Sequence, residues 1–289
     1  MSIRESELIL NTDGSVYHLN LKPENIAQDI IFVGDQDRVE KVTKHFDSIE
    51  FKTQKREFKT ITGIYKNKRI TVISTGIGPD NIDIVLNELD ALVNIDLETR
   101  TPKVKLTKLN IVRIGTSGAL QSEIPINSFL ISTHALDING MLHSYLIDEI
   151  SNSVIENAFV KHTNWSAKKP YPIIIENNKE LELKFSSTKT HKGITATAGG
   201  FYGPQGRVLR LPVQDSELNT KINSFNYNGQ KISNLEMETS AIYGLSKLLG
   251  HNAISMNAII ANRTNEVFSK NPDKVIEDLI LYTIDRIIN

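Results

Sequence analysis

Cysteine is absent from this chain of 289 residues. Without thiols the protein can form no disulfide bond, use no thiolate nucleophile and hold no zinc ion through sulfur. An excess of charge of either sign is also absent, because 33 basic and 34 acidic residues leave a formal net charge of −1. A nucleic-acid-binding protein normally carries a basic excess, so we expect no nucleic-acid partner.

Long hydrophobic runs are missing as well. No stretch reaches the roughly 18 consecutive apolar residues that a transmembrane helix needs, so we expect no membrane partner. Residues 1–7 include two acids and no apolar core, and we therefore expect no signal peptide. These absences, with an ordinary content of 39% hydrophobic residues, predict a cytoplasmic protein that acts on small molecules.

Short apolar segments alternate with amphipathic ones along the chain. The segments expected to be buried strands are rich in Ile and Val and bounded by Gly, Asp, Asn or Lys. They are Asp29–Val33, Arg69–Ser74, Asn110–Gly115, Asn127–Thr133, Lys192–Ala198 and Ala253–Ala261. Apolar residues recur at helical spacing in four segments, which we expect to be helices. These are the segment after Gly34-Asp35, Pro79–Val93, Glu238–Leu249 and the segment after Pro272. This alternation predicts an α/β fold with a largely central sheet.

The length of the chain fits one hydrophobic core near its upper size, so we predict a single domain over residues 1–289. Two stretches interrupt the alternation. Residues 97–108 are polar and basic, and residues 143–187 show only weak periodicity. We expect both to be exposed inserts, the second an irregular excursion or a helical lid.

Two segments place an arginine near glycine at the end of a strand. After Gly34 a helix begins within a few residues, and its free N–H groups together with Arg38 suit a phosphate. Taken alone, this segment is better explained as an ordinary turn with Asp35 as the N-cap and Arg38 in solvent. Arg113 lies inside an apolar strand that continues into Gly115-Thr116-Ser117-Gly118. Because burying an unpaired arginine is costly, we favour an anion site there over a surface arginine on an edge strand.

Three further segments carry polar side chains after strands. Gln205 and Arg207 lie in the loop 201–207, where an amide and a guanidinium match the carbonyl, N–H and carbonyl face of uracil, with Phe201 able to stack on the ring. Residues 236–238 read Glu-Met-Glu, which suits sugar hydroxyls as well as an ordinary acidic helix start. Residues 262–264 read Asn-Arg-Thr and also fit a polar turn.

Together these segments resemble the nucleoside phosphorylase family, and within it the uridine phosphorylase branch. Eight motifs occur in the family's order. They are Val-Tyr-His at 16–18, Gly-Asp-Gln-Asp-Arg at 34–38, Arg-Glu-Phe at 56–58, Ser-Thr-Gly-Ile-Gly at 74–78, Arg-Ile-Gly-Thr-Ser-Gly at 113–118, Phe-Tyr-Gly-Pro-Gln-Gly-Arg at 201–207, Glu-Met-Glu at 236–238 and Asn-Arg-Thr at 262–264.

The resemblance implies a fold and a set of roles. The fold is a central mixed sheet, partly barrel-like and flanked by helices, in a homodimer or larger ring whose subunits share their active sites. Phosphate is held by Gly34, Arg38, Arg113 and Thr116, with Arg56 from the neighbouring subunit. Ribose is held by Met237 and Glu238, with His18 from the neighbour at the 5′-hydroxyl. The base is bound by Gly118, Phe201, Gln205 and Arg207, with Glu236 and Arg263 nearby.

The implied reaction is phosphorolysis of uridine to uracil and ribose 1-phosphate, with Arg113, Glu238, Gln205 and Arg207 as catalytic residues. Nucleoside and inorganic phosphate are then the substrates, and no cofactor is expected. A monovalent cation near Glu57 and Ile77 stays open, since Asn81 stands where the family has a serine.

The sequence departs from the family at two places. Gly203-Pro204 is unusual between Phe201 and Gln205, and residues 198–200 lack polar side chains, which leaves the choice of base open. Three alternatives therefore stay open. These are a purine nucleoside phosphorylase, a nucleosidase on the same fold, and a non-catalytic nucleoside-binding protein. Asn262 replaces the aspartate of purine-specific relatives, and the retained Arg38, Arg56 and Arg113 disfavour a nucleosidase.

Overall fold

The computed structural model describes residues 2–288. Within this range twelve strands form one mixed sheet, whose main path runs β11-β12-β10-β8-β13-β7-β1-β4-β3-β2. The strands of this path are β1 (Asp29–Val33), β2 (Ser48–Lys55), β3 (Phe58–Tyr65), β4 (Lys68–Ser74), β7 (Asn110–Ala119), β8 (Phe129–Asp137), β10 (Thr190–Thr197), β11 (Asn226–Tyr227), β12 (Gln230–Glu236) and β13 (Asn252–Asn262). Two strands pair beside the path, β9 (Ile173–Glu176) with β8 and β14 (Val267–Phe268) with β13.

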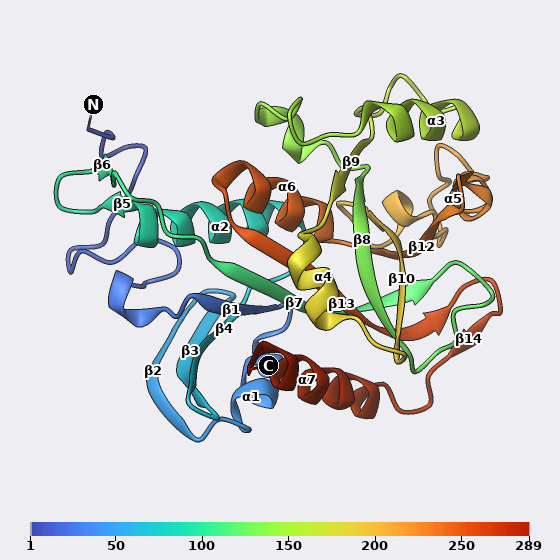
Figure 1. Ribbon diagram of the computed structural model, residues 1–289. Helices are drawn as coiled ribbons and strands as arrows, with labels where there is room; N and C mark the ends of the chain where they lie inside the picture. Colours follow the sequence, from blue (N-terminus) through green and yellow to red (C-terminus); the bar gives the residue numbers. More distant parts are fainter. Residues whose placement is uncertain (1, 289) are drawn as a thin grey trace.

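Helices cover both faces of the sheet (Figure 1). Strand β1 is buried along its whole length, and its side chains alternate between two cores. Ile30 and Phe32 pack with α2 (Pro79–Asn94) and α6 (Thr239–Leu249), whereas Ile31 and Val33 pack with α1 (Gln36–Thr43) and α7 (Pro272–Ile288). Covered on both faces, such a strand is apolar at every position, as its sequence indicated.

Part of the sheet closes into a barrel. Strand β12 runs parallel to β10 and also pairs antiparallel with β7, where Leu235 faces Gly118. Strands β7, β13, β8, β10 and β12 therefore form a closed ring. The closure brings the ends of β7 and β12, which carry two of the predicted motifs, side by side. The predicted α/β class with a partly barrel-like sheet is confirmed.

The predicted strands occur; β1 has the predicted bounds, and the bounds of the others are shifted. Strand β7 continues to Ala119 because β13 and β12 pair with its second half. The strand expected at 127–133 instead spans Phe129–Asp137, since Asn127 adopts a left-handed backbone with φ of 66°. The hairpin of β2 and β3 was not predicted. Strand β2 is largely exposed and polar, so its sequence lacked the apolar signal.

The two expected inserts differ in their surroundings. Residues 102–108 are exposed and follow a small two-stranded sheet of β5 (Ile95–Asp96) and β6 (Thr101–Pro102). The stretch 143–187 is not an exposed insert, because β9 joins the central sheet and Phe159 and Phe185 are fully buried. Its short elements, including α3 (Ser153–Thr163) and α4 (Lys179–Phe185), are too brief to show periodicity. None of the helices within residues 2–288 has the length and apolarity required to cross a bilayer.

Candidate active site

A buried arginine is the centre of the site. Arg113 on β7 is 7% exposed, and its guanidinium contacts acidic and amide groups on β12, on β13 and at the start of α6. Nη2 lies 2.6 Å from Glu238 Oε2 and 3.1 Å from Glu236 Oε2, and Nη1 lies 3.0 Å from Asn257 Oδ1 on β13. Although burial opposes its charge, Glu236 and Glu238 raise the pKa of Arg113. The arginine is therefore a fixed cation at this end of the sheet.

Two glutamates position this arginine. Glu238 lies at the start of α6, and its Oε1 accepts a hydrogen bond of 2.9 Å from the backbone of Gly78. Burial raises the pKa of Glu238; Arg113 opposes this shift and Glu236 adds to it. Glu236 accepts from Thr197 Oγ1 at 2.6 Å and from the backbone N–H of Glu238 at 2.9 Å. With these bonds Glu236 holds Arg113 and the first turn of α6; whether it also contacts the base stays a prediction.

Gly115 leaves space for the guanidinium. A Cβ atom at this position would lie 1.9 Å from Arg113 Nη1 and 2.3 Å from its Cζ. Real Cβ atoms are essentially never found so close to another heavy atom. The glycine two residues after the arginine is thus required by the folded-back side chain, which explains this part of the motif.

Three other predicted phosphate ligands surround Arg113. Gly34 lies between β1 and the Asp35 cap of α1, and Arg38 on α1 donates to the Ile114 carbonyl at 3.3 Å. That carbonyl belongs to the residue after Arg113. Burial and then the charge of Arg113 lower the pKa of Arg38. Thr116 follows on β7, half-buried, and its hydroxyl has no hydrogen-bond partner within residues 2–288. A free hydroxyl can donate to an anion, and Thr116 stays a predicted phosphate ligand.

The predicted base-binding residues form a second group. The Gln205 side chain is buried, and its Oε1 accepts from Arg207 Nη1 and, at 2.7 Å, from Arg263 Nη2. Arg263 also donates to the Gln205 carbonyl at 3.1 Å. Gly118 lies against Arg263, since a Cβ atom on Gly118 would be 3.5 Å from Arg263 Nε. Burial and then the charge of Arg207 lower the pKa of Arg263 to about 10. These contacts fix the amide orientation of Gln205.

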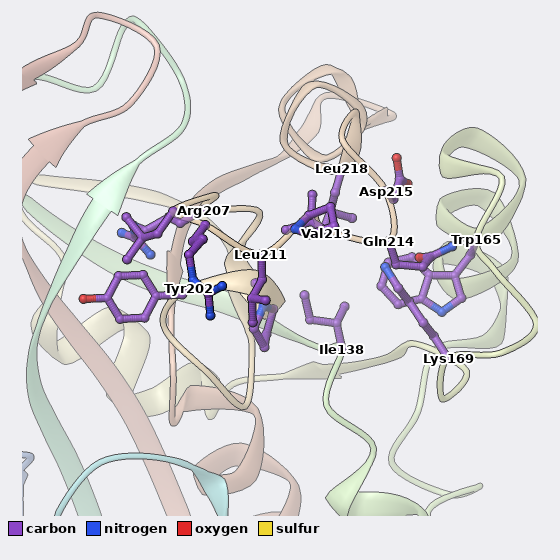
Figure 2. A pocket seen from close by; sticks show the side chains of 15 residues that line it. Ile138, Trp165, Lys169, Tyr202, Arg207, Leu211, Val213, Gln214, Asp215 and Leu218 are labelled. Atoms are coloured by element: carbon purple, nitrogen blue, oxygen red, sulfur yellow. The ribbon is translucent and has the colours of Figure 1, made fainter.

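The loop that carries Gln205 is open to solvent. Phe201 is 50% exposed, and the Arg207 guanidinium lies 3.8 Å above the centre of its ring. Behind the loop is a cavity of about 710 Å³. In Figure 2 Arg207 and Tyr202 border one side of this cavity, and Trp165 and Lys169 border the other. Arg207 therefore lies between the Phe201 ring and this cavity.

Two predicted residues lie apart from both groups. His18, in the N-terminal segment, bonds to Glu88 on α2 at 2.6 Å. Arg56 occupies the turn between β2 and β3 with φ of 55°, and its exposed side chain has no ion pair in the described chain. No contact within residues 2–288 joins either residue to the Arg113 group. Met237 is half-buried between Glu236 and Glu238, beside that group.

The residues considered for a cation do not form a site in one subunit. The Ile77 carbonyl accepts a hydrogen bond of 3.4 Å from the Asn81 amide. Glu57 lies near Gly76, where an added Cβ would be 3.1 Å from Glu57 Cγ. Over the described range, no three His, Asp or Glu side chains are grouped to hold a metal ion. The monovalent cation near Glu57 and Ile77, which the family resemblance places between subunits, stays a prediction.

Sequence reasoning missed several groups that complete the site. Asn257 and Ser255 on β13 contact Arg113, and Gly78 contacts Glu238. Two alternate polar residues in the otherwise apolar strand 253–261 were a usable signal, because buried polar groups need partners. Gly78 belongs to the motif at 74–78, but its bond to Glu238 has no sequence signal, since it spans 160 residues.

Comparison with known proteins defines the class. Residues 28–283 match the model of the phosphorylase superfamily, and the chain belongs to this family. It is 29% identical over 272 residues to a uridine phosphorylase of Thermococcus kodakarensis, which covers 91% of this chain and 83% of that protein. A purine nucleoside phosphorylase of DeoD type from Brevibacillus brevis is 25% identical over 240 residues, 83% of each chain.

A solved structure gives the same result. The chain is similar to a Trypanosoma brucei nucleoside phosphorylase whose crystal structure is described as showing uridine phosphorylase activity. The TM-score is 0.85 with 28% identity, over 95% of this chain and 98% of that one. The resemblance to the uridine phosphorylase branch, predicted from the eight motifs, is confirmed.

Proposed function

We propose that the protein is a pentosyltransferase that cleaves uridine with phosphate to give uracil and ribose 1-phosphate. One observation carries the proposal. Arg113 lies in the middle of β7, and Arg263, which holds Gln205, lies against Gly118 near the end of the same strand. An anion site and a site for a planar amide-like ring are thus next to each other, and Glu238 borders the anion site.

Phosphate binds where Arg38 and Arg113 approach each other, with Gly34 and Thr116 as further donors. The carboxylates of Glu236 and Glu238 balance these two cations in the isolated chain. We therefore assign Arg56 of a neighbouring subunit as the added cation for the phosphate charge. Its exposed, unpaired side chain supports this role, as does its left-handed backbone, since strain of this kind concentrates at functional sites.

Ribose lies against Met237, and the Glu238 carboxylate orients it by accepting hydrogen bonds from the sugar hydroxyls. The bond between C1′ and N1 of uracil breaks, and its electron pair leaves with the base. The sugar then carries positive charge, as in other glycosidic cleavages, and a phosphate oxygen forms the new bond to C1′. The uracil anion takes its proton from solvent.

The leaving base is stabilised by Gln205 and Arg207. Because the Gln205 oxygen is held by two arginines, its amide N–H groups remain free for a ring carbonyl. Arg207 leaves the Phe201 face when the ring stacks there and donates to the second carbonyl. These charge-assisted bonds strengthen as negative charge develops, which lowers the barrier.

The amide side chain of Asn262 cannot protonate a purine leaving group. Its amide donates to the carbonyls of Gln121 and Ile124, both at 2.9 Å, so it is bound within the loop. This disfavours the alternative that the protein is a purine nucleoside phosphorylase. A nucleosidase would need none of the phosphate arginines, and a binding protein would not need them held by buried glutamates.

The test offers uridine, thymidine, cytidine, inosine and adenosine separately with phosphate and measures the free base by chromatography. We expect uracil as the main product and little or no hypoxanthine or adenine. A main product of hypoxanthine would assign the chain to the purine branch. Tight binding of uridine without any product would assign it to a nucleoside-binding protein.

A further inference from the structure

A carboxylate outside the site holds the predicted ribose ligand His18. Glu88 on α2 accepts three N–H groups from the N-terminal segment. Glu88 Oε1 lies 2.6 Å from His18 Nδ1. The His18 backbone nitrogen lies between the two carboxylate oxygens, 2.9 Å from Oε1 and 3.1 Å from Oε2. The Leu19 backbone nitrogen lies 2.8 Å from Oε2. The two residues are 70 positions apart in the chain.

This arrangement selects one state of the imidazole ring. An ionised carboxylate only accepts hydrogen bonds, and two backbone N–H groups already bind this one. The imidazole nitrogen that faces it must therefore carry a proton, so His18 is protonated at Nδ1. Its Nε2 then has no partner within residues 2–288 and lies on a side chain that is 30% exposed. A neutral ring in this tautomer presents an acceptor to the outside.

The other side of His18 is also fixed. The Tyr17 ring lies edge-on to the imidazole, with 4.9 Å between the ring centres. Lys55 donates to the Tyr17 carbonyl and lies 4.3 Å over the Tyr17 ring. Because Lys55 directly precedes Arg56, it connects Arg56 to the segment that carries His18. These are the two residues assigned to the neighbouring subunit's site. The N-terminal segment is thus held as one unit with the β2–β3 turn.

We propose that Glu88 is a positioning residue for the reaction. It holds His18 with Nδ1 protonated, so that Nε2 accepts a hydrogen bond from the ribose 5′-hydroxyl of a nucleoside in the neighbouring subunit. This inference rests on the proposed function. It adds a specificity element, since a substrate without the 5′-hydroxyl cannot use the bond. Helix α2 also contributes Gly78 to Glu238 of its own site, so the same helix contacts both sites.

The kinetic test compares Glu88→Gln with the unaltered protein on uridine and on 5′-deoxyuridine. A glutamine places an amide donor among three N–H groups and no longer fixes the tautomer. We expect kcat/KM for uridine to fall roughly tenfold, about the value of one hydrogen bond, with kcat/KM for 5′-deoxyuridine unchanged. The matched control is Glu277→Gln on α7, which removes a carboxylate 2.9 Å from His45 outside the site. Equal losses for both substrates, or no loss for either, would overturn the proposal.

Side-chain nitrogen NMR of His18 gives a readout that is independent of turnover. The resonance is assigned by its loss in His18→Ala. The unaltered protein is expected to show a protonated Nδ1 and a bare Nε2, and Glu277→Gln should leave this pattern intact. A bare Nδ1 in the unaltered protein refutes the proposal even if Glu88→Gln does not fold. If no nucleoside is turned over, the proposed function fails, and the NMR still decides whether Glu88 sets the tautomer.

Discussion

Replacing Gly115 with alanine tests whether the Arg113 cluster is built as described. The added Cβ would stand 1.9 Å from Nη1, 2.3 Å from Cζ and 2.6 Å from Nη2, so the guanidinium must move. Movement breaks the bonds to Glu238 at 2.6 Å, to Glu236 at 3.1 Å and to Asn257 at 3.0 Å. Leaving buried charges unpaired costs about 3–5 kcal/mol, and we expect the free energy of unfolding to fall by that amount.

The assay is urea denaturation followed by fluorescence or circular dichroism. Gly118→Ala on the same strand is the matched control for stability, because its nearest neighbour would be 3.5 Å away, an ordinary contact. We expect it to lose less than about 1 kcal/mol. Gly115→Ala should also lose detectable phosphate binding. Equal stability losses for the two variants would refute the packing of Arg113 against Gly115.

Three further predictions concern the base, the shared site and pH. Arg207→Ala should lower kcat/KM for uridine about 10²–10³-fold with little change in Tm, because the loop is exposed; an unchanged rate would remove Arg207 from the base site. Mixing inactive Arg56→Ala and Arg113→Ala proteins should restore activity in hybrid oligomers, and no recovery in confirmed hybrids would exclude a shared site. Burial raises the pKa of Asp137, so the native state holds its proton to higher pH than the unfolded chain. Stability should then fall as pH rises above the ordinary value of 3.8. Urea denaturation at a series of pH values should show a weaker fall for Asp137→Asn; parallel curves would contradict it.

Much of the fold could be predicted because buried parallel strands and amphipathic helices leave strong local patterns. The run Asp29–Val33 was predicted with the bounds that the structure shows. Strand β2 could not be predicted, because its exposed polar residues gain their strand conformation from pairing with β3. The closure of the barrel depends on register between β7 and β12, which no local pattern specifies.

The site was predictable as a set of residues but not as a set of contacts. Arg113 was identified because an arginine in an apolar strand demands partners, yet the partners Glu238 and Asn257 lie 125 and 144 residues away. The bond from Arg263 to Gln205 spans 58 residues, and its effect on the amide orientation follows only from three-dimensional geometry. Contacts of this kind are decided by tertiary packing.

Phosphorus NMR of the protein with uridine and inorganic phosphate tests the central claim most directly. The account predicts that the phosphate signal declines while a ribose 1-phosphate signal rises in equal amount, together with free uracil. Uracil must not form when phosphate is omitted. Release of uracil and free ribose at the same rate without phosphate would contradict the account, because Arg38 and Arg113 would then hold no reacting phosphate.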